Sequence, residues 1–73
     1  MAKLSELKAG SEGKILSVAG NAHFQSRVTA VGITPGSTVK VIQNKRFHPM
    51  LIYTRNTLLA VNREDCDLIE MEG

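Results

Sequence analysis

The stretch Arg27–Val39, which reads RVTAVGITPGSTV, decides how this chain folds. Its first part has helical spacing and runs into Gly32, the residue type that most readily takes the left-handed conformation that ends a helix. Pro35 prevents the helix from continuing, and Thr34–Ser37 has the proline and glycine placement of a type II turn. The stretch therefore predicts a helix, an abrupt stop, a turn and the start of a strand.

The helix that stops at Gly32 is expected to begin after Asn21. An asparagine side chain can accept a hydrogen bond from a free amide in the first turn of a helix. Phe24, Val28 and Val31 recur at intervals of four and three residues, which predicts that all three lie on the buried face. We therefore expect one short amphipathic helix here.

Five segments rich in β-branched and aliphatic residues predict strands. They are residues 14–19, 38–43, 50–54, 57–61 and 68–71. A helical or 3₁₀ turn ending at Gly10 is expected before the first strand, and a brief helical turn capped by Asn62 before the last. Asn56 can take the left-handed geometry of a tight hairpin turn. The fold prediction is a mainly β chain: a small SH3-like five-stranded barrel with one short helix inserted after the first strand and a helical turn before the last.

Length, cysteine content and hydropathy bound the class of protein. A chain of 73 residues with 42% apolar content is expected to form a single domain over residues 1–73. Its one cysteine, Cys66, cannot form the intramolecular disulfides that small secreted domains usually need. No apolar run approaches the roughly 20 residues that span a bilayer, and the start of the chain lacks the apolar core of a signal peptide. We predict a cytoplasmic protein that is not inserted in a membrane.

Charge is distributed unevenly along the chain. Residues 1–63 contain all nine Lys and Arg but only two of the seven acidic residues, whereas the remaining five acids lie in residues 64–72. In a compact fold such segments can pack side by side and compensate each other. A net charge of +2 is therefore weak evidence for nucleic-acid binding.

The chain resembles the FeoA family, small cytoplasmic accessory proteins of bacterial ferrous iron uptake. The pairing of Gly32–Ile33 with Pro35–Gly36 is the most characteristic part of this resemblance. Further similar positions extend over nearly the whole chain: Leu4, Leu7, Gly10, Gly13, Ile15, Gly20, Leu59–Arg63, Cys66, Ile69 and Met71. Valine at positions 28 and 31 departs from the leucines common in the family helix, and Asn56 stands where glycine is common.

The resemblance implies a non-catalytic accessory protein that binds the cytosolic GTPase region of a FeoB-type iron transporter. We also predict that the protein has no small-molecule substrate, and that it is a monomer or self-associates weakly. Within this sequence, the expected partner contacts are Gln25 and Arg27 on the exposed side of the helix, together with Lys45, Arg46 and His48 in a basic loop.

Two alternative functions stay open. The same SH3-like module occurs as the carboxy-terminal domain of DtxR-type metal-dependent repressors, so a free-standing relative could bind a transition metal or a regulatory partner. The second alternative is a small nucleic-acid-binding barrel, because Lys45–His48 places cations beside an aromatic ring. A base-stacking platform needs several exposed rings, and the chain has only three aromatic residues, so nucleic acid is the weaker alternative.

Catalytic and metal-binding motifs are lacking in the sequence. Neither His23 nor His48 lies in a motif that couples it to Cys66 or to a serine, so we predict that the protein is not an enzyme. The possible ligands for ferrous iron or another transition metal are His23, His48, Cys66, Glu64, Asp65 and Asp67. No two of the His and Cys residues are separated by the spacing that metal ligands need, so we predict weak metal binding at most and assign no metal site.

Overall fold

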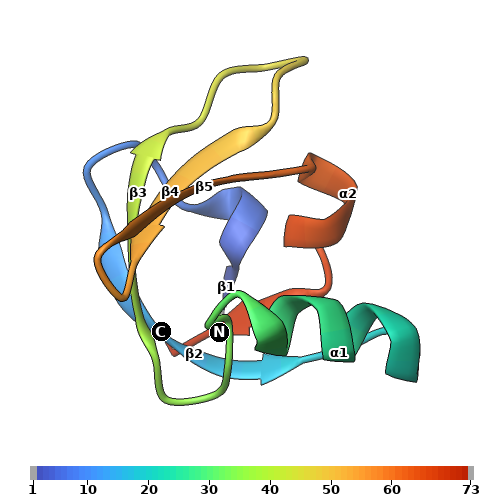
Figure 1. Cartoon of the computed structure of the whole chain (residues 1–73). Helices are drawn as coiled ribbons and strands as arrows, with labels where there is room; N and C mark the ends of the chain where they lie inside the picture. Colours follow the sequence, from blue (N-terminus) through green and yellow to red (C-terminus); the bar gives the residue numbers. More distant parts are fainter. Residues whose placement is uncertain (1, 73) are drawn as a thin grey trace.

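In the computed structural model, which describes residues 2–72, six strands form one antiparallel sheet, with two short helices on one side of it (Figure 1). The strands are β1 (Ala2–Lys3), β2 (Glu12–Val18), β3 (Thr38–Gln43), β4 (Met50–Thr54), β5 (Thr57–Val61) and β6 (Ile69–Met71). The helical elements are the 3₁₀ turn η1 (Leu4–Glu6), helix α1 (Ala22–Ala30) and helix α2 (Arg63–Cys66). The strand order is β1-β6-β2-β3-β4-β5. The mainly β, SH3-like prediction is confirmed at this level.

The prediction of a closed five-stranded barrel is wrong in two details. A sixth strand is present, because Ala2 pairs with Met71 and Lys3 with Glu70. A segment of two residues is too short to show the alternation of a strand in its sequence, so β1 is recognised as a strand only by its pairing with β6. Within residues 2–72, β1 and β5 do not pair, so the sheet is curled but open.

The curl of the sheet comes from β2, which serves two neighbours. The first half of β2 pairs with β3, and the second half pairs with β6. A register shift between Ile15 and Ser17 separates part of this pairing, and a bulge of this kind bends a strand and increases its twist. Strand β2 begins at Glu12, two residues before its predicted start, because the pairing with β3 reaches Glu12. It ends at Val18, one residue before its predicted end.

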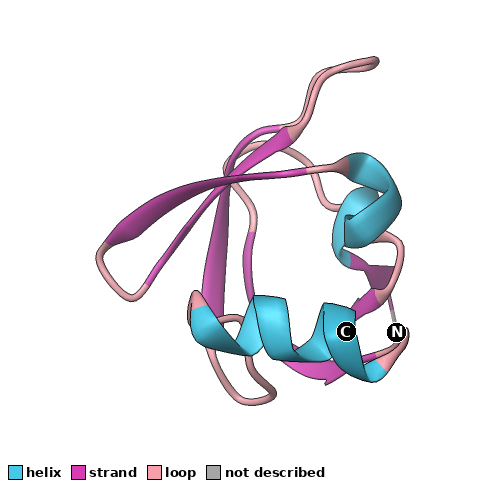
Figure 2. Ribbon diagram, turned by 45° about the vertical axis from the view of Figure 1, so that its right-hand side comes forward, coloured by secondary structure: helices cyan, strands magenta, loops and turns pink. Residues whose placement is uncertain are grey.

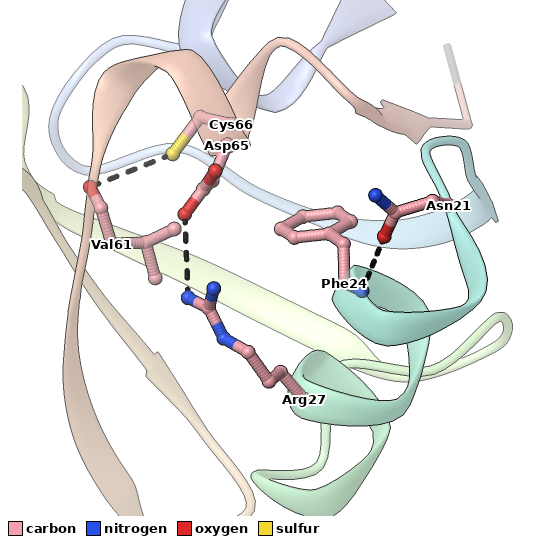
Figure 3. Close-up of polar contacts among 6 residues, drawn as sticks. All are labelled: Asn21, Phe24, Arg27, Val61, Asp65 and Cys66. Carbon is pink, nitrogen blue, oxygen red and sulfur yellow. Dashed lines mark hydrogen bonds and ion pairs between the residues drawn. The ribbon is translucent and has the colours of Figure 1, made fainter.

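Helix α1 begins as predicted. The side-chain oxygen of Asn21 accepts a hydrogen bond from the Phe24 amide at 2.8 Å (Figure 3). Phe24 and Val28 are buried, which confirms the predicted inward face over these two positions. The prediction that Val31 is also buried is wrong, because Val31 lies beyond the last helical residue and its side chain is 47% exposed.

The stop after α1 explains why Val31 leaves the core. Gly32 has φ of 95°, as predicted, and the Ile33 amide then donates to the Val28 carbonyl at 2.8 Å. This fold-back buries Ile33 almost completely, so Ile33 fills the place that helical spacing assigned to Val31. The following turn is also confirmed, because Gly36 has φ of 90° and the Ser37 amide donates to Thr34 at 3.0 Å.

The hairpin of β4 and β5 has regular pairing from Thr54–Thr57 to Met50–Val61. Arg55 and Asn56 form its two-residue turn, with φ of 51° and 62°. These angles match a type I′ turn, which joins strands with the natural twist of a sheet. The left-handed role predicted for Asn56 is confirmed, and Arg55 shares it.

The two short helical turns differ slightly from prediction. The turn η1 ends at Glu6 rather than at Gly10, because the Leu7 amide closes it by donating to Leu4. The side chain of Asn62 makes no cap hydrogen bond to α2; its carbonyl instead accepts from the Cys66 amide at 3.0 Å. The last strand starts at Ile69, since the Leu68 amide is used by the end of α2.

The core lies between the curled sheet and the helices. Twelve apolar side chains are buried there: Leu4, Ile15, Phe24, Val28, Ile33, Val39, Val41, Met50, Ile52, Cys66, Ile69 and Met71. Thr54 is buried with them, and its hydroxyl donates to the Thr38 carbonyl at 2.9 Å. Burying a hydroxyl without a partner would destabilise the fold, so this bond explains how the sheet tolerates it.

Candidate functional site

The basic loop, residues 44–49, joins β3 to β4 and projects from the top of the molecule (Figures 1 and 2). Its turn is closed by the His48 amide, which donates to the Lys45 carbonyl at 3.2 Å. Lys45, Arg46 and His48, three of the predicted partner-binding residues, are all exposed on it. The loop therefore presents two cations, Lys45 and Arg46, at its exposed tip.

Phe47 lies between Arg46 and His48 in the chain and is 87% exposed. Its φ of 66° lies in the left-handed region, which is unusual for a bulky side chain. The guanidinium carbon of Arg46 lies 5.3 Å from the centroid of the Phe47 ring, which is a cation–π contact. A solvent-exposed aromatic residue with a left-handed backbone, next to an exposed cation, is a candidate for contact with a partner.

The base of the basic loop is held to the rest of the fold. The side-chain amide of Asn44 donates to the carbonyls of Leu7 at 2.7 Å and Ser5 at 3.2 Å. The Arg63 guanidinium donates to the Asn44 side-chain oxygen and to the Lys45 carbonyl. The loop base is thus fixed while its tip remains exposed.

A hollow of about 340 Å³ lies beside the loop tip. Its lining residues are Phe47, His48, Pro49, Asn62, Arg63 and Glu64. The hollow joins the loop to the start of α2 and contains groups of both charges. The hollow borders the exposed ring of Phe47.

Gln25 and Arg27, the other two predicted contacts, lie on α1 at the opposite end of the molecule. In both views α1 is at the bottom and the basic loop is at the top, with α2 between them (Figures 1 and 2). The five predicted residues therefore lie on two separate elements, and the hollows beside these elements have only Asn62 in common. Sequence spacing could not reveal this, because the two segments are separated by the whole of β3.

Both α1 residues have intramolecular partners. The side-chain amide of Gln25 donates to the Gly20 carbonyl at 3.0 Å. The Arg27 guanidinium lies 3.8 Å from the Asp65 carboxylate on α2, and the Arg27 side chain is 60% exposed (Figure 3). An exposed pair at this distance contributes little to stability. It does show the expected approach of a basic segment to the acidic end of the chain.

A second hollow, of about 200 Å³, lies between α1 and β5. It is lined by Arg27, Val28, Val31, Ile33, Leu59–Asn62 and Asp65. No pattern in the sequence indicates this groove, because it depends on the exposure of Val31 and on the open edge of β5. The groove brings one predicted contact, Arg27, next to apolar side chains.

The possible metal ligands do not converge. Within residues 2–72, no three His, Cys, Asp or Glu side chains are grouped so that they could hold a metal ion. Cys66 is fully buried, and its Sγ lies 3.8 Å from the Val61 carbonyl (Figure 3). Burial raises the pKa of this thiol to about 12; Arg63 opposes the rise, and Asp65 and Asp67 add to it. The thiol is therefore protonated at neutral pH and packs as a small apolar group.

Neither helix in the described part of the chain has the length and hydropathy needed to cross a bilayer. No protein with a curated description matches the chain. Solved structures do match this chain.

The FeoA protein of Chlorobium tepidum is 31% identical, with a TM-score of 0.84 over 96% of this chain and 68% of that one. FeoA of Stenotrophomonas maltophilia, an SH3 domain protein complexed with zinc, is 19% identical, with a TM-score of 0.84 over 99% of this chain and 91% of that one. A manganese-dependent transcriptional repressor shares the fold at 13% identity and a TM-score of 0.86, over 93% of this chain but 39% of its own.

The family itself is decided by sequence. The FeoA domain matches residues 2–73, which include every element of the sheet and both helices. The match confirms the resemblance carried by Gly32–Ile33 and Pro35–Gly36. This chain belongs to the FeoA family.

Proposed function

We propose that this chain is a non-catalytic, cytoplasmic accessory protein of ferrous iron uptake that binds the cytosolic GTPase region of a FeoB-type transporter. Family membership supports the class of partner. The basic loop supports the mode of binding, because it combines an exposed ring with two cations on a fixed base. The single observation that carries the proposal is the exposure of Phe47 in a left-handed conformation beside Arg46.

Each part of the loop has a distinct role in such a complex. Lys45 and Arg46 would accelerate encounter with an acidic surface, since complementary charge acts mainly on the association rate. Phe47 would be buried on contact, because aromatic side chains are enriched at the core of protein interfaces. The bonds of Asn44 would keep the loop base in place, which limits the conformational entropy lost on binding.

The direct test is binding of the purified chain to the purified GTPase region of the transporter. Phe47→Ala should weaken binding at least tenfold, because it removes the ring while leaving the cations. Leu16→Ala is the matched control, since Leu16 is also a large exposed apolar residue but lies on β2. Equal affinity for both variants and the parent chain would reject the loop as the contact surface.

Binding of metal and of nucleic acid is measured in parallel titrations. Ferrous ion, added without oxygen, and short RNA and DNA duplexes are titrated into the labelled chain in separate samples. Tight nucleic-acid binding without transporter binding would favour the alternative of a nucleic-acid-binding barrel. Metal binding that perturbs residues outside the loop, again without transporter binding, would favour a role like that of a detached repressor domain.

A further inference from the structure

The outer edge of β5 is an unpaired strand edge. Strand β5 stands at the end of the strand order, and within residues 2–72 no strand pairs with its far side. The other end of the sheet is β1, which has only two residues. An edge of five residues with regular geometry is the more capable template for a further strand.

The register of the hairpin shows which groups face outward. Thr54 and Thr57 flank the two-residue turn and are therefore a hydrogen-bonded pair, and such pairs alternate along an antiparallel ladder. Leu58 and Ala60 consequently direct their backbone N–H and C=O groups away from β4. Neither residue donates or accepts a backbone hydrogen bond elsewhere in the described part of the chain.

Strand β5 lacks the devices that usually block an exposed edge. Its sequence is Thr-Leu-Leu-Ala-Val, without proline, charge or bulge. The Leu58 side chain is 58% exposed, so the strand is also apolar on its outer face. Natural edge strands commonly carry lysine, proline or a bulge, and this one carries none of them.

The groove between α1 and β5 runs along this edge. Four consecutive residues, Leu59–Asn62, line it, and consecutive strand residues point to opposite faces. The groove therefore borders the backbone edge itself and not only one face of the strand. Its opposite wall is apolar, formed by Val28, Val31 and Ile33.

Arg27 adds a charge preference at the rim. Its guanidinium is held by one carboxylate, Asp65, at the long distance of 3.8 Å, and the side chain is largely exposed (Figure 3). A guanidinium has five N–H donors, so most of them are available to a second carboxylate. Asp65 also lines the groove, but its side chain is 25% exposed against 60% for Arg27, so an acidic side chain that enters from solvent meets the guanidinium first.

From these observations we infer that β5 binds an extended peptide segment of a partner protein by strand addition. The segment pairs its backbone with Leu58 and Ala60, places an apolar side chain in the groove, and places an acidic side chain two residues away against Arg27. The two side chains project to the same face because alternate residues of a strand do so. Strand addition gives affinity through the backbone and specificity through such alternate positions. This site shares only Asn62 with the hollow beside the basic loop, and it does not rest on the proposed function.

The probe is the peptide acetyl-Thr-Val-Thr-Asp-Thr-amide, titrated into the full-length chain labelled with ¹⁵N. The inference predicts shifts centred on the amides of Leu58, Ala60 and Val31, and slower hydrogen exchange at Leu58 and Ala60. A second peptide carries methyl groups on its three central amides and keeps every side chain. It should bind at least tenfold more weakly, because it cannot pair with a strand edge.

Variants of the chain test the edge and the charge separately. Ala60→Pro removes an outward N–H without breaking a bond to β4, and should weaken peptide binding at least tenfold, whereas Ala60→Thr keeps the N–H and should bind like the parent. Arg27→Glu should weaken binding of the aspartate peptide at least fivefold and should favour a peptide with lysine in that place. Lys40→Glu, an equal charge reversal at an exposed position of β3 outside the groove, should change neither affinity.

Three results would overturn the inference. The first is equal binding of the methylated and unmethylated peptides, which remains informative even where Ala60→Pro does not fold. The second is a set of shifts confined to the basic loop. The third is dimerisation of the chain through β5 without peptide, seen by sedimentation and abolished by Ala60→Pro, since a second copy would then occupy the edge.

Discussion

Arg63 donates a hydrogen bond from its guanidinium to the side-chain oxygen of Asn44, 19 residues earlier in the chain. The amide of the same Asn44 side chain donates to the carbonyls of Leu7 and Ser5. One side chain thus joins the start of α2, the base of the basic loop and the exit of η1. No local sequence motif predicts this junction, because its residues come from three separate segments of the chain.

Asn44→Ala should destabilise the protein by about 1–3 kcal/mol, since it leaves partly buried carbonyls and a guanidinium without their partner. Chemical denaturation measures this change, and amide hydrogen exchange in the basic loop should become faster. Asn62→Ala is the control, because Asn62 makes no side-chain cap hydrogen bond. Equal stability of the two variants would show that the junction is dispensable.

Gly36→Ala should lower the free energy of unfolding by about 1–2 kcal/mol, the usual penalty for an L-residue in the left-handed region. Nothing lies within 4 Å of the added methyl group, so the loss would come from the backbone alone. Gly13→Ala adds the same methyl group without a positive φ and should be nearly neutral. D-alanine at position 36, introduced by chemical synthesis, should restore stability; if it is as destabilising as L-alanine, the turn assignment is wrong.

Stability should fall above pH 9 because of Cys66. The thiol has a pKa of about 12 in the folded chain against 9.0 without the fold, so the unfolded state loses its proton first. This contribution to stability is therefore fully present below pH 9, and it is lost at about 1.4 kcal/mol per pH unit as pH rises toward the folded value.

The measurement for Cys66 is urea denaturation at several pH values between 8 and 11. Cys66→Ala should show a shallower decline than the parent chain, whatever its absolute stability, because other groups titrate equally in both. Thiol-specific labelling should likewise be slow in the native state and fast in urea. Parallel pH curves for the two proteins would contradict the assigned burial effect.

Reversing two charges in the basic loop, Lys45→Glu with Arg46→Glu, should slow association with the transporter's GTPase region. The parent rate should also fall as salt rises, since screening shortens the range of attraction to about 10 Å at 0.1 M. The melting temperature should hardly change, because both side chains are exposed. Association that is insensitive to both salt and the double reversal would leave the loop without a steering role.

Much of the local structure could be predicted from sequence because its causes are local. The cap at Asn21, the stop at Gly32 and the turn at Gly36 depend on side-chain hydrogen bonding and on the allowed φ of single residues, which act in any surroundings. The hairpin around Asn56 follows for the same reason. Alternating apolar residues likewise identified β3 and the buried positions Val39 and Val41.

The candidate site was predictable only in part. Lys45, Arg46 and His48 stand out in sequence as a basic loop, and their role in binding a partner stays a prediction. That Gln25 and Arg27 lie at the other end of the molecule depends on how α1 packs on the sheet. The exposure and left-handed backbone of Phe47 depend on where β3 ends and β4 begins.

Local signals in the sequence were enough to identify the family, the order of every element except β1, and the turns at Gly32, Gly36 and Asn56, because steric limits and hydrogen bonding within a few residues decide these features. The tertiary structure alone decided that β1 pairs with β6, that the sheet stays open between β1 and β5, and that Ile33 displaces Val31 from the core. Each of these outcomes is a competition among distant segments for the same pairing edge or the same buried volume. Ala2–Lys3 forms a strand only when β6 is present to pair with it, and Val31 is exposed only because Ile33 occupies the buried position.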